Sequence, residues 1–255
     1  MMWIPRSWGE IVGNGRTVQG LKNLLRTMKF DGMRGPNTFV KGQSRTGKTS
    51  QVKLFAQCLL CEQLDPNTLD PCNGTCSFCR RPQNLELLRA GDGISGLYSF
   101  SSGFTYQYTK LDCPSLTDSL LTQRLAEIHE CRGGHVVHLE EAHRLAARSL
   151  FERLLIPLEE RGVMWIATSI RTTGLDRAFL NRFPVKLTTS KPSISELARW
   201  LAARCSEQQI TVDDPETLRS LAQLADCNPG RALNLLTEIQ LMNRGNLTAD
   251  FMGDR

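Results

Sequence analysis

Residues 42–49 read GQSRTGKT and fit the pattern G-x-x-x-x-G-K-[S/T]. In this pattern the glycines let backbone N–H groups turn inward around phosphate oxygens, and the next helix directs its positive N-terminal end at them. The flanks agree, because NTFV before the loop suits a strand and residues 48–60 have apolar residues at helical spacing. An ordinary glycine-rich surface turn is the alternative. The stretch predicts a strand–loop–helix phosphate site in which Lys48 contacts the β and γ phosphates and Thr49 holds Mg²⁺.

Apolar strands and helical patterns alternate through the first two thirds of the chain. HVVHL (135–139), VMWIATS (163–169) and FPVKLTT (183–189) suit strands, and GLYSFSS (96–102) is a further candidate. Helical spacing is found at residues 16–28, 48–60 and 115–130, and ARSLFERLLIPLEE (147–160) suits a helix ending near Arg161 and Gly162. Strands that are apolar throughout and alternate with helices indicate a parallel sheet covered on both faces, which is an α/β domain over residues 1–189.

The pattern changes after Lys191-Pro192. Three helical stretches follow in a row, with start signals at Ser193, at Asp213-Asp214 and at Asn228. We therefore expect a small all-helical lid domain over residues 190–255.

Two adjacent acids end the apolar strand HVVHL, in the segment VVHLEEAHRL (136–145). Beside a phosphate loop, the first acid of such a pair contacts the water shell of the metal ion and the second polarises the attacking water. Glu140 is the expected Mg²⁺-side acid and Glu141 the expected base. The commonest version of this pattern has Asp first, so hydrolysis is expected to be slowed more readily than binding. The alternative is a helix N-terminus whose acids offset the helix dipole.

Four of the nine cysteines lie close together with the spacing C-x₁₀-C-x₃-C-x₂-C. Tetrahedral Zn²⁺ with four thiolates accommodates this spacing, and zinc stabilises a segment that has too few apolar residues to fold alone. The predicted ligands are Cys61, Cys72, Cys76 and Cys79, in a zinc module over about residues 58–82. Free thiols are the alternative. We interpret Cys58 as helix packing, together with Cys113, Cys131, Cys205 and Cys227.

The bulk properties narrow the class of protein. A net charge of +5 permits an acidic partner but does not demand one. The sequence contains no apolar stretch of about 20 residues, and its start has no apolar run typical of a signal peptide. We therefore expect a cytoplasmic protein with reduced thiols and no membrane partner.

Several motifs occur in an order that resembles a known family. GQSRTGKTS, the cysteine segment LLCEQLDPNTLDPCNGTCSFCR, LEEAHRL, WIATS, LNRF and NPGRALNLL follow one another as in bacterial clamp-loader ATPases of the AAA+ superfamily. The closest likeness is to the tau/gamma subunits of DNA polymerase III, and it covers nearly all of residues 5–250. The resemblance implies an AAA+ ATPase that uses ATP, Mg²⁺ and Zn²⁺, with DNA, other AAA+ subunits or a sliding clamp as partners.

The resemblance also assigns roles to individual residues. It places Val12 and Gly13 near the adenine, and either Thr168 or Ser169 as the polar sensor of the γ-phosphate. Arg231 becomes the lid arginine that contacts the γ-phosphate, with a surface helix charge as the alternative. Arg182 becomes the finger that reaches a neighbouring subunit's nucleotide, with a structural arginine at the hinge as the alternative. The expected contacts of the nucleotide are, in addition, Gly42, Gln43, Ser44, Arg45, Thr46, Gly47, Lys48, Thr49 and Ser50.

Two departures from the family bear on function. Clamp loaders typically carry Ser-Arg-Cys where this chain has Asn181-Arg182-Phe183, and their subunits usually add a collar domain after the lid, where this sequence stops at Arg255. We expect an ATPase that assembles on DNA in replication or repair, with Arg144 and Arg148 as the best candidates for DNA contact. The alternative is a nucleotide-dependent switch that hydrolyses ATP poorly and recruits a partner protein.

Overall fold

The structure is a computed structural model that describes residues 5–80, 96–99, 105–129, 134–160, 162–242 and 245–247. A six-stranded sheet forms its centre, with the strand order β2-β3-β4-β5-β1-β6. Neighbouring strands are parallel except β2 and β3, which are antiparallel. The strands are β1 (Thr38–Gly42), β2 (Gly96–Ser99), β3 (Thr105–Asp112), β4 (Gly134–Glu140), β5 (Val163–Ser169) and β6 (Val185–Thr189).

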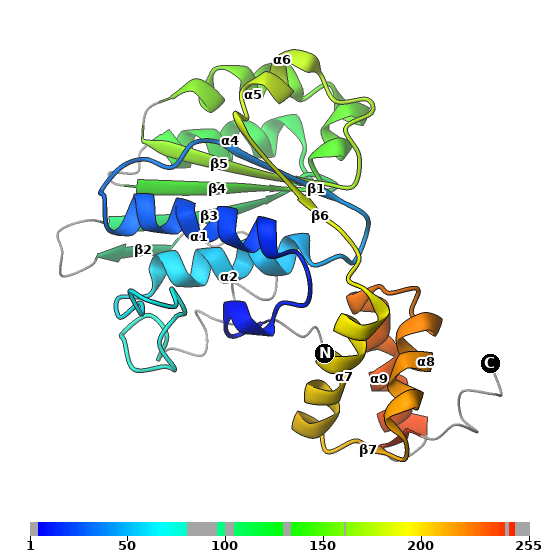
Figure 1. The fold of residues 1–255 in the computed structure, drawn as a ribbon. Coiled ribbons are helices and arrows are strands. Elements are labelled where there is room, and N and C mark those ends of the chain that lie inside the picture. The colour runs from blue at the N-terminus through cyan, green and yellow to red at the C-terminus, as the bar shows by residue number, and fades with distance from the viewer. Residues whose placement is uncertain are drawn as a thin grey trace.

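Helices cover both faces of this sheet, as Figure 1 shows. One face packs on α1 (Gly15–Lys29), α2 (Lys48–Leu60) and the cysteine segment, and the other on α4 (Asp118–His129), α5 (Phe151–Leu155) and α6 (Arg177–Asn181). Alternate strand residues serve the two cores, because successive side chains of a strand point to opposite faces. Val136 and Ile166 pack on the α1–α2 side, whereas Val137 and Trp165 pack on the other.

The third hydrophobic cluster belongs to α7 (Ile194–Glu207), α8 (Pro215–Leu224) and α9 (Pro229–Met242). Their starts follow the sequence signals. Ser193 and Glu196 form a capping box before α7, Asp214 accepts from the N–H of Glu216, and Asn228 accepts from the N–H of Arg231. Two short strands join this helical lid, since β7 (Thr211–Val212) pairs with β8 (Asn246–Leu247).

One helix predicted from sequence was wrong, and one strand was not predicted. The helix expected over residues 147–160 is broken into the 3₁₀ helix η2 (Ala142–Arg148), α5 and the 3₁₀ helix η3 (Pro157–Glu159). Ser149 has a left-handed backbone with φ of 53°, and Pro157 has no N–H to continue a helix. Strand β3 was missed because its buried residues Gln107 and Thr109 are polar.

Among the described residues, no helix is long and apolar enough to span a membrane.

Candidate functional site

A cavity of about 460 Å³ opens at the carboxyl ends of β1, β4 and β5, next to α7 and α9. Ligands of open α/β sheets bind at this end of the strands, and the volume lies in the usual range for small-molecule sites. The cavity is lined by most of the predicted contacts, namely Val12, residues 44–50, Glu140, Glu141, Thr168 and Ser169. The fold therefore brings together predicted contact residues that are up to 157 positions apart, from Val12 to Ser169.

The backbone of the phosphate loop needs glycine at two positions. Gly47 precedes α2 with φ of 88°, a left-handed conformation that side chains with a Cβ rarely adopt. A Cβ on Gly42 would lie 2.6 Å from the carbonyl oxygen of Thr189 on β6. Thr46 closes the loop, because its hydroxyl donates to the Gln43 carbonyl and bonds the Thr189 hydroxyl at 2.7 Å. The loop is shaped by its own side chains and by the neighbouring strand.

Lys48 is the first residue of α2 and is buried at the cavity wall. Its ammonium donates to the carbonyl oxygens of Gly42 at 2.8 Å and Gln43 at 2.7 Å. Burial lowers the pKa of Lys48, while the charges of Glu141 and Glu140 oppose that shift. Gly42 and Gln43 thus serve this site by holding Lys48.

The lid touches the loop directly. The Asn228 side chain donates to the Ser44 carbonyl at 2.9 Å, and the Gly230 N–H donates to the Arg45 carbonyl at 3.3 Å. Gly230 also lines the cavity, and a Cβ there would lie 2.8 Å from the Cβ of Arg45. Arg231, the next residue, is exposed and does not line the cavity.

Glu140 ends β4 and has both carboxylate oxygens engaged. Oε1 accepts from the Thr49 hydroxyl at 2.6 Å, and Oε2 forms an ion pair with the ammonium of Lys110 on β3. Burial works against ionisation of Glu140, but the ion pair with Lys110 and the hydrogen bond from Thr49 help to hold its pKa below the usual value. A hydroxyl and an ionised carboxylate in contact are hard oxygen ligands, which fit Mg²⁺.

Glu141 lies beyond the strand in a left-handed conformation with φ of 56°. Its carboxylate lines the cavity and is 44% exposed, and it lies 3.9 Å from His143 Nε2 and 3.8 Å from Arg144 Nε. The positive φ turns the chain at the end of the strand, so Glu140 and Glu141 sit in different surroundings. The second acid is the one with access to water.

Both candidate sensors at the end of β5 are buried and line the cavity. The Thr168 hydroxyl bonds His138 Nε2 at 3.1 Å, and the other ring nitrogen of His138 bonds the Tyr108 hydroxyl at 2.9 Å. Burial lowers the pKa of His138 to about 4, so its neutral ring links β3 to β5. Ser169 bonds His143 Nδ1 at 3.4 Å and the Arg171 backbone. The two residues therefore belong to separate hydrogen-bond networks.

Arg182 lies at the end of α6 and does not line the cavity. Its guanidinium donates to the carbonyls of Leu155 and Ala178 and forms an ion pair with Glu159 at 2.7 Å. In this chain by itself, Arg182 ties α6 to the segment before β5.

The N-terminal segment and the lid form another part of the cavity wall. Ile11 and Val12 line the cavity together with Trp200 of α7, whose indole N–H donates to the Glu10 carbonyl at 2.7 Å. Gly13 does not line the cavity, and its left-handed backbone lies against Pro192.

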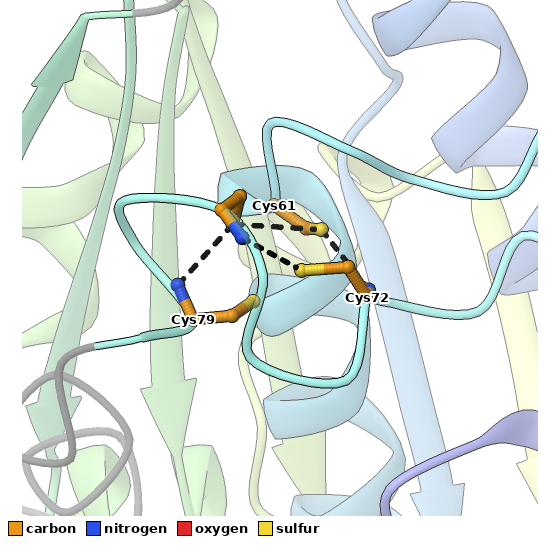
Figure 2. Close-up of side chains that lie close together, drawn as sticks. Cys61, Cys72 and Cys79 are labelled. Carbon is orange, nitrogen blue, oxygen red and sulfur yellow. Dashed lines mark hydrogen bonds between the residues drawn. The ribbon is translucent and has the colours of Figure 1, made fainter.

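The four predicted zinc ligands converge. Their sulfur atoms all lie within 4.8 Å of one another, and Cys61 Sγ and Cys76 Sγ are 4.0 Å apart. Zn–S bonds of about 2.3 Å in a tetrahedron separate sulfurs by roughly 3.8 Å, so the cluster fits zinc. Figure 2 shows Cys72 and Cys79 of the loop facing Cys61 at the end of α2. Backbone N–H groups of Cys72, Cys76 and Cys79 donate to sulfurs within the cluster.

The N-terminal segment anchors this cysteine module. Trp8 belongs to the 3₁₀ helix η1 (Trp8–Glu10), and its indole N–H donates to the Leu69 carbonyl at 2.7 Å. Its backbone N–H donates to the Asp70 carboxylate at 2.7 Å. The buried side chains of Trp8 and Leu69 belong to the same hydrophobic core as the buried faces of α1 and α2. Residues 8–12 therefore contact the cysteine module at one end and the cavity at the other.

Sequence reasoning missed part of the site. It did not find Lys110, nor the cavity residues Ile11, Trp200, Leu233 and Thr237. The available signal was the stretch TYQYTKLD, whose alternation could have marked a strand ending in a charged pair beside VVHLEE. The lid residues face the cavity only because α7 and α9 fold back on the loop.

Comparison with solved structures identifies the fold. The Holliday junction branch migration motor RuvB of Thermotoga maritima superposes with a TM-score of 0.66 at 15% identity, covering 98% of this chain and 70% of that chain. The ORC1 protein of Aeropyrum pernix, solved in complex with DNA, gives 0.63 at 17% identity, covering 96% of this chain and 65% of that chain. The sequence matches no family model and no curated protein. The chain therefore shares the α/β fold of these proteins, a mostly parallel sheet with helices on both faces and a helical lid, as the sequence predicted.

Proposed function

We propose that this protein binds and hydrolyses ATP and that it is a clamp-loader-type AAA+ protein that assembles on DNA in replication or repair. The observation that carries the proposal is the convergence of the phosphate loop, Glu140, Glu141 and the lid on one cavity. Structural neighbours that act on DNA, RuvB and ORC1, support the DNA part. The likeness to clamp loaders rests on the sequence motifs.

The chain's own groups divide the work of hydrolysis. Loop N–H groups and Lys48 bind the phosphates, and Lys48 offsets the charge that develops on the transferred phosphoryl group. Glu141 accepts a proton from the attacking water, because it lines the cavity and is open to solvent. Mg²⁺, held near Thr49 and Glu140, supplies charge neutralisation when bound. Thr168 or Ser169 senses the γ-phosphate from the end of β5.

Two arginines need a change of contacts to act as proposed. Arg231 follows cavity residue Gly230, so a rotamer change or a small lid movement brings it to the phosphates. Arg182 must leave Glu159 to reach the nucleotide of a neighbouring subunit. Both roles therefore belong to a nucleotide-bound assembly.

DNA contact is the least localised part of the proposal. Arg144 is 61% exposed and lies beside Glu141, so it is available to a phosphate backbone near the cavity. The side chain of Arg148 and residue Arg81 lie outside the described part of the chain, as do Cys131 and residues 248–255. Two further arginines already have partners within the chain and are weaker candidates for DNA contact. Arg80 donates to the Thr75 carbonyl, and Arg124 pairs with Glu127.

We further propose that Cys61, Cys72, Cys76 and Cys79 hold a structural zinc ion. The support is that the four sulfurs lie within 4.8 Å of one another and that backbone N–H groups are directed at them. A four-thiolate site leaves no open coordination position, so its role is to stabilise the module. A cytoplasmic location, where thiols stay reduced, suits such a site.

The experiment that tests the main proposal is ATPase turnover of the wild type and of Glu141→Gln, with and without primed DNA, alongside the assembly mass in ATP. We expect turnover that primed DNA stimulates, that Glu141→Gln abolishes, and that accompanies assembly in ATP. The proposal fails if the wild type neither binds DNA nor changes its turnover on any DNA substrate.

A weakly hydrolysing switch is the second candidate function. Two contacts favour it, namely the ion pair of Lys110 with the metal-side acid Glu140 and the commitment of Arg182 to Glu159. It predicts tight ATP binding with turnover well below about 1 per minute at any DNA concentration, far under ordinary enzyme rates. Normal Glu141-dependent turnover on DNA excludes it.

A further inference from the structure

Lys110 stands beside the proposed Mg²⁺ site but has no part in the mechanism above. It lies near the end of β3, two residues before Asp112, which is in register with Glu140 on β4. Its side chain is 12% exposed and that of Glu140 is 15% exposed, so their ion pair is largely shielded from water. Such a pair is screened much less by salt than a surface pair. We therefore expect the ion pair of Lys110 with Glu140 to persist at ordinary salt concentrations.

The pair takes up the carboxylate that the metal ion needs. Glu140 Oε2 is bound to Lys110, while Oε1 accepts the Thr49 hydroxyl at 2.6 Å. Thr49 and Glu140 are the two side chains proposed for Mg²⁺. Here they are hydrogen-bonded to each other, and Glu140 is also paired with Lys110. The negative charge that would attract a cation is already compensated by the protein itself.

A second buried lysine adds positive charge near Glu140. Lys53, one turn after Thr49 on α2, is 5% exposed. Burial lowers its pKa, as does the charge of Lys110, whereas Glu140 opposes the shift. Lys53, Lys110 and Glu140 therefore interact electrostatically, and the two lysines weaken the attraction of Glu140 for a divalent cation.

We propose that Lys110 is a positioning residue that acts as the built-in counter-ion of Glu140 and makes nucleotide binding only weakly dependent on Mg²⁺. The ammonium competes with the ion for Glu140 Oε2 and keeps the carboxylate against Thr49. The inference rests on the proposed nucleotide site and specifies its metal requirement.

The test is the affinity for a fluorescent ATP analogue, measured by equilibrium titration in excess Mg²⁺ and in EDTA. For the wild type we expect the two dissociation constants to agree within about threefold, and for Lys110→Met to differ by about tenfold or more. Lys110→Arg keeps the charge and should behave as the wild type. Equal ratios in the wild type and Lys110→Met overturn the inference. Lys110→Gln, which keeps a hydrogen-bond donor, replaces the Met variant if that variant does not fold.

A second measurement separates this inference from the proposed function. Mn²⁺ is titrated into the nucleotide-free protein and its binding is followed by electron paramagnetic resonance. We expect Lys110→Met to bind Mn²⁺ about tenfold more tightly than the wild type. If the wild type binds no nucleotide under any condition, the proposed function fails, and the Mn²⁺ comparison still decides the role of Lys110. Equal Mn²⁺ affinities contradict that role.

Discussion

The nucleotide cavity and the cysteine module are two proposed ligand sites that the chain prepares in different ways. In the cavity, charged groups are already paired within the protein, with Lys48 on two loop carbonyls and Glu140 between Thr49 and Lys110. In the module, four sulfurs face one another and accept N–H groups of their own loop. Thiolates at this spacing repel one another unless a cation lies between them.

The two sites need their proposed ligands for different reasons. The cavity is built on a parallel sheet with helices on both faces, so its shape survives without nucleotide. The module follows α2 as a loop without a regular helix or strand in its described residues, and we propose that zinc bound by its cysteines stabilises it. We therefore expect loss of metal to change folding and loss of nucleotide contacts to change binding.

The largest expected effect is on the module. Cys76→Ser removes one of four proposed ligands and should abolish stoichiometric zinc, lowering the free energy of unfolding by about 3 kcal/mol or more. Metal analysis of the purified protein and urea unfolding measure both quantities. Cys227→Ser, a half-buried thiol outside the cluster, is the matched control and should retain zinc. Full zinc content in Cys76→Ser would show that the cluster is not the metal site.

The next effect is on the cavity. Lys48→Met should weaken nucleotide binding about 100-fold, because it removes a desolvated charge from the phosphates, while the unfolding free energy changes by less than about 1 kcal/mol. Lys41→Met, at an exposed position of β1 just before the phosphate loop, is the control. Titration with a labelled nucleotide and thermal unfolding check this. A large loss of stability in Lys48→Met would erase the contrast between the two sites.

A pair of tryptophan variants tests whether the two regions are independent. Trp8→Phe leaves the buried Leu69 carbonyl without its indole donor and should cost about 1–2 kcal/mol of stability with weaker zinc retention. Trp200→Phe loses the bond to the Glu10 carbonyl at the cavity and should weaken nucleotide binding by about threefold. Zinc content and nucleotide affinity are measured for both variants. If each variant changes both quantities equally, residues 8–12 couple the sites.

The smallest expected effect is on the pH dependence of stability, through two buried histidines of β4. Burial lowers the pKa of His135 and of His138 to about 4 each, below the value of 6.5 expected when unfolded. Both are therefore neutral in the fold, so their protonation at lower pH favours the unfolded chain. The stability that the two neutral histidines contribute is complete above pH 6.5 and is lost as pH falls towards 4. Urea unfolding should show about 1 kcal/mol less stability at pH 6 than at pH 7. His138→Gln should reduce this slope, and a slope of the opposite sign would contradict the assignment.

Much of the fold was accessible from sequence because its signals are local. Helix α2 spans the residues expected for it, and α7, α8 and α9 begin next to their predicted start signals. These features depend on contacts within a few residues. The segment over residues 147–160 was mispredicted because its apolar spacing suits a helix while Ser149 and Pro157 interrupt it.

The phosphate loop, the two acids and the four cysteines can be predicted from sequence alone, because each is a short pattern whose chemistry depends on residue type and spacing. Which charged side chains meet depends on the fold. Lys110 and Glu140 are far apart in sequence and pair because β3 lies next to β4 in parallel register. Strand order and register follow from burial across the whole sheet, and no local pattern encodes them. The proposed metal requirement of the cavity therefore comes from the fold, although the residues proposed to hold the phosphates are eight consecutive residues of the sequence.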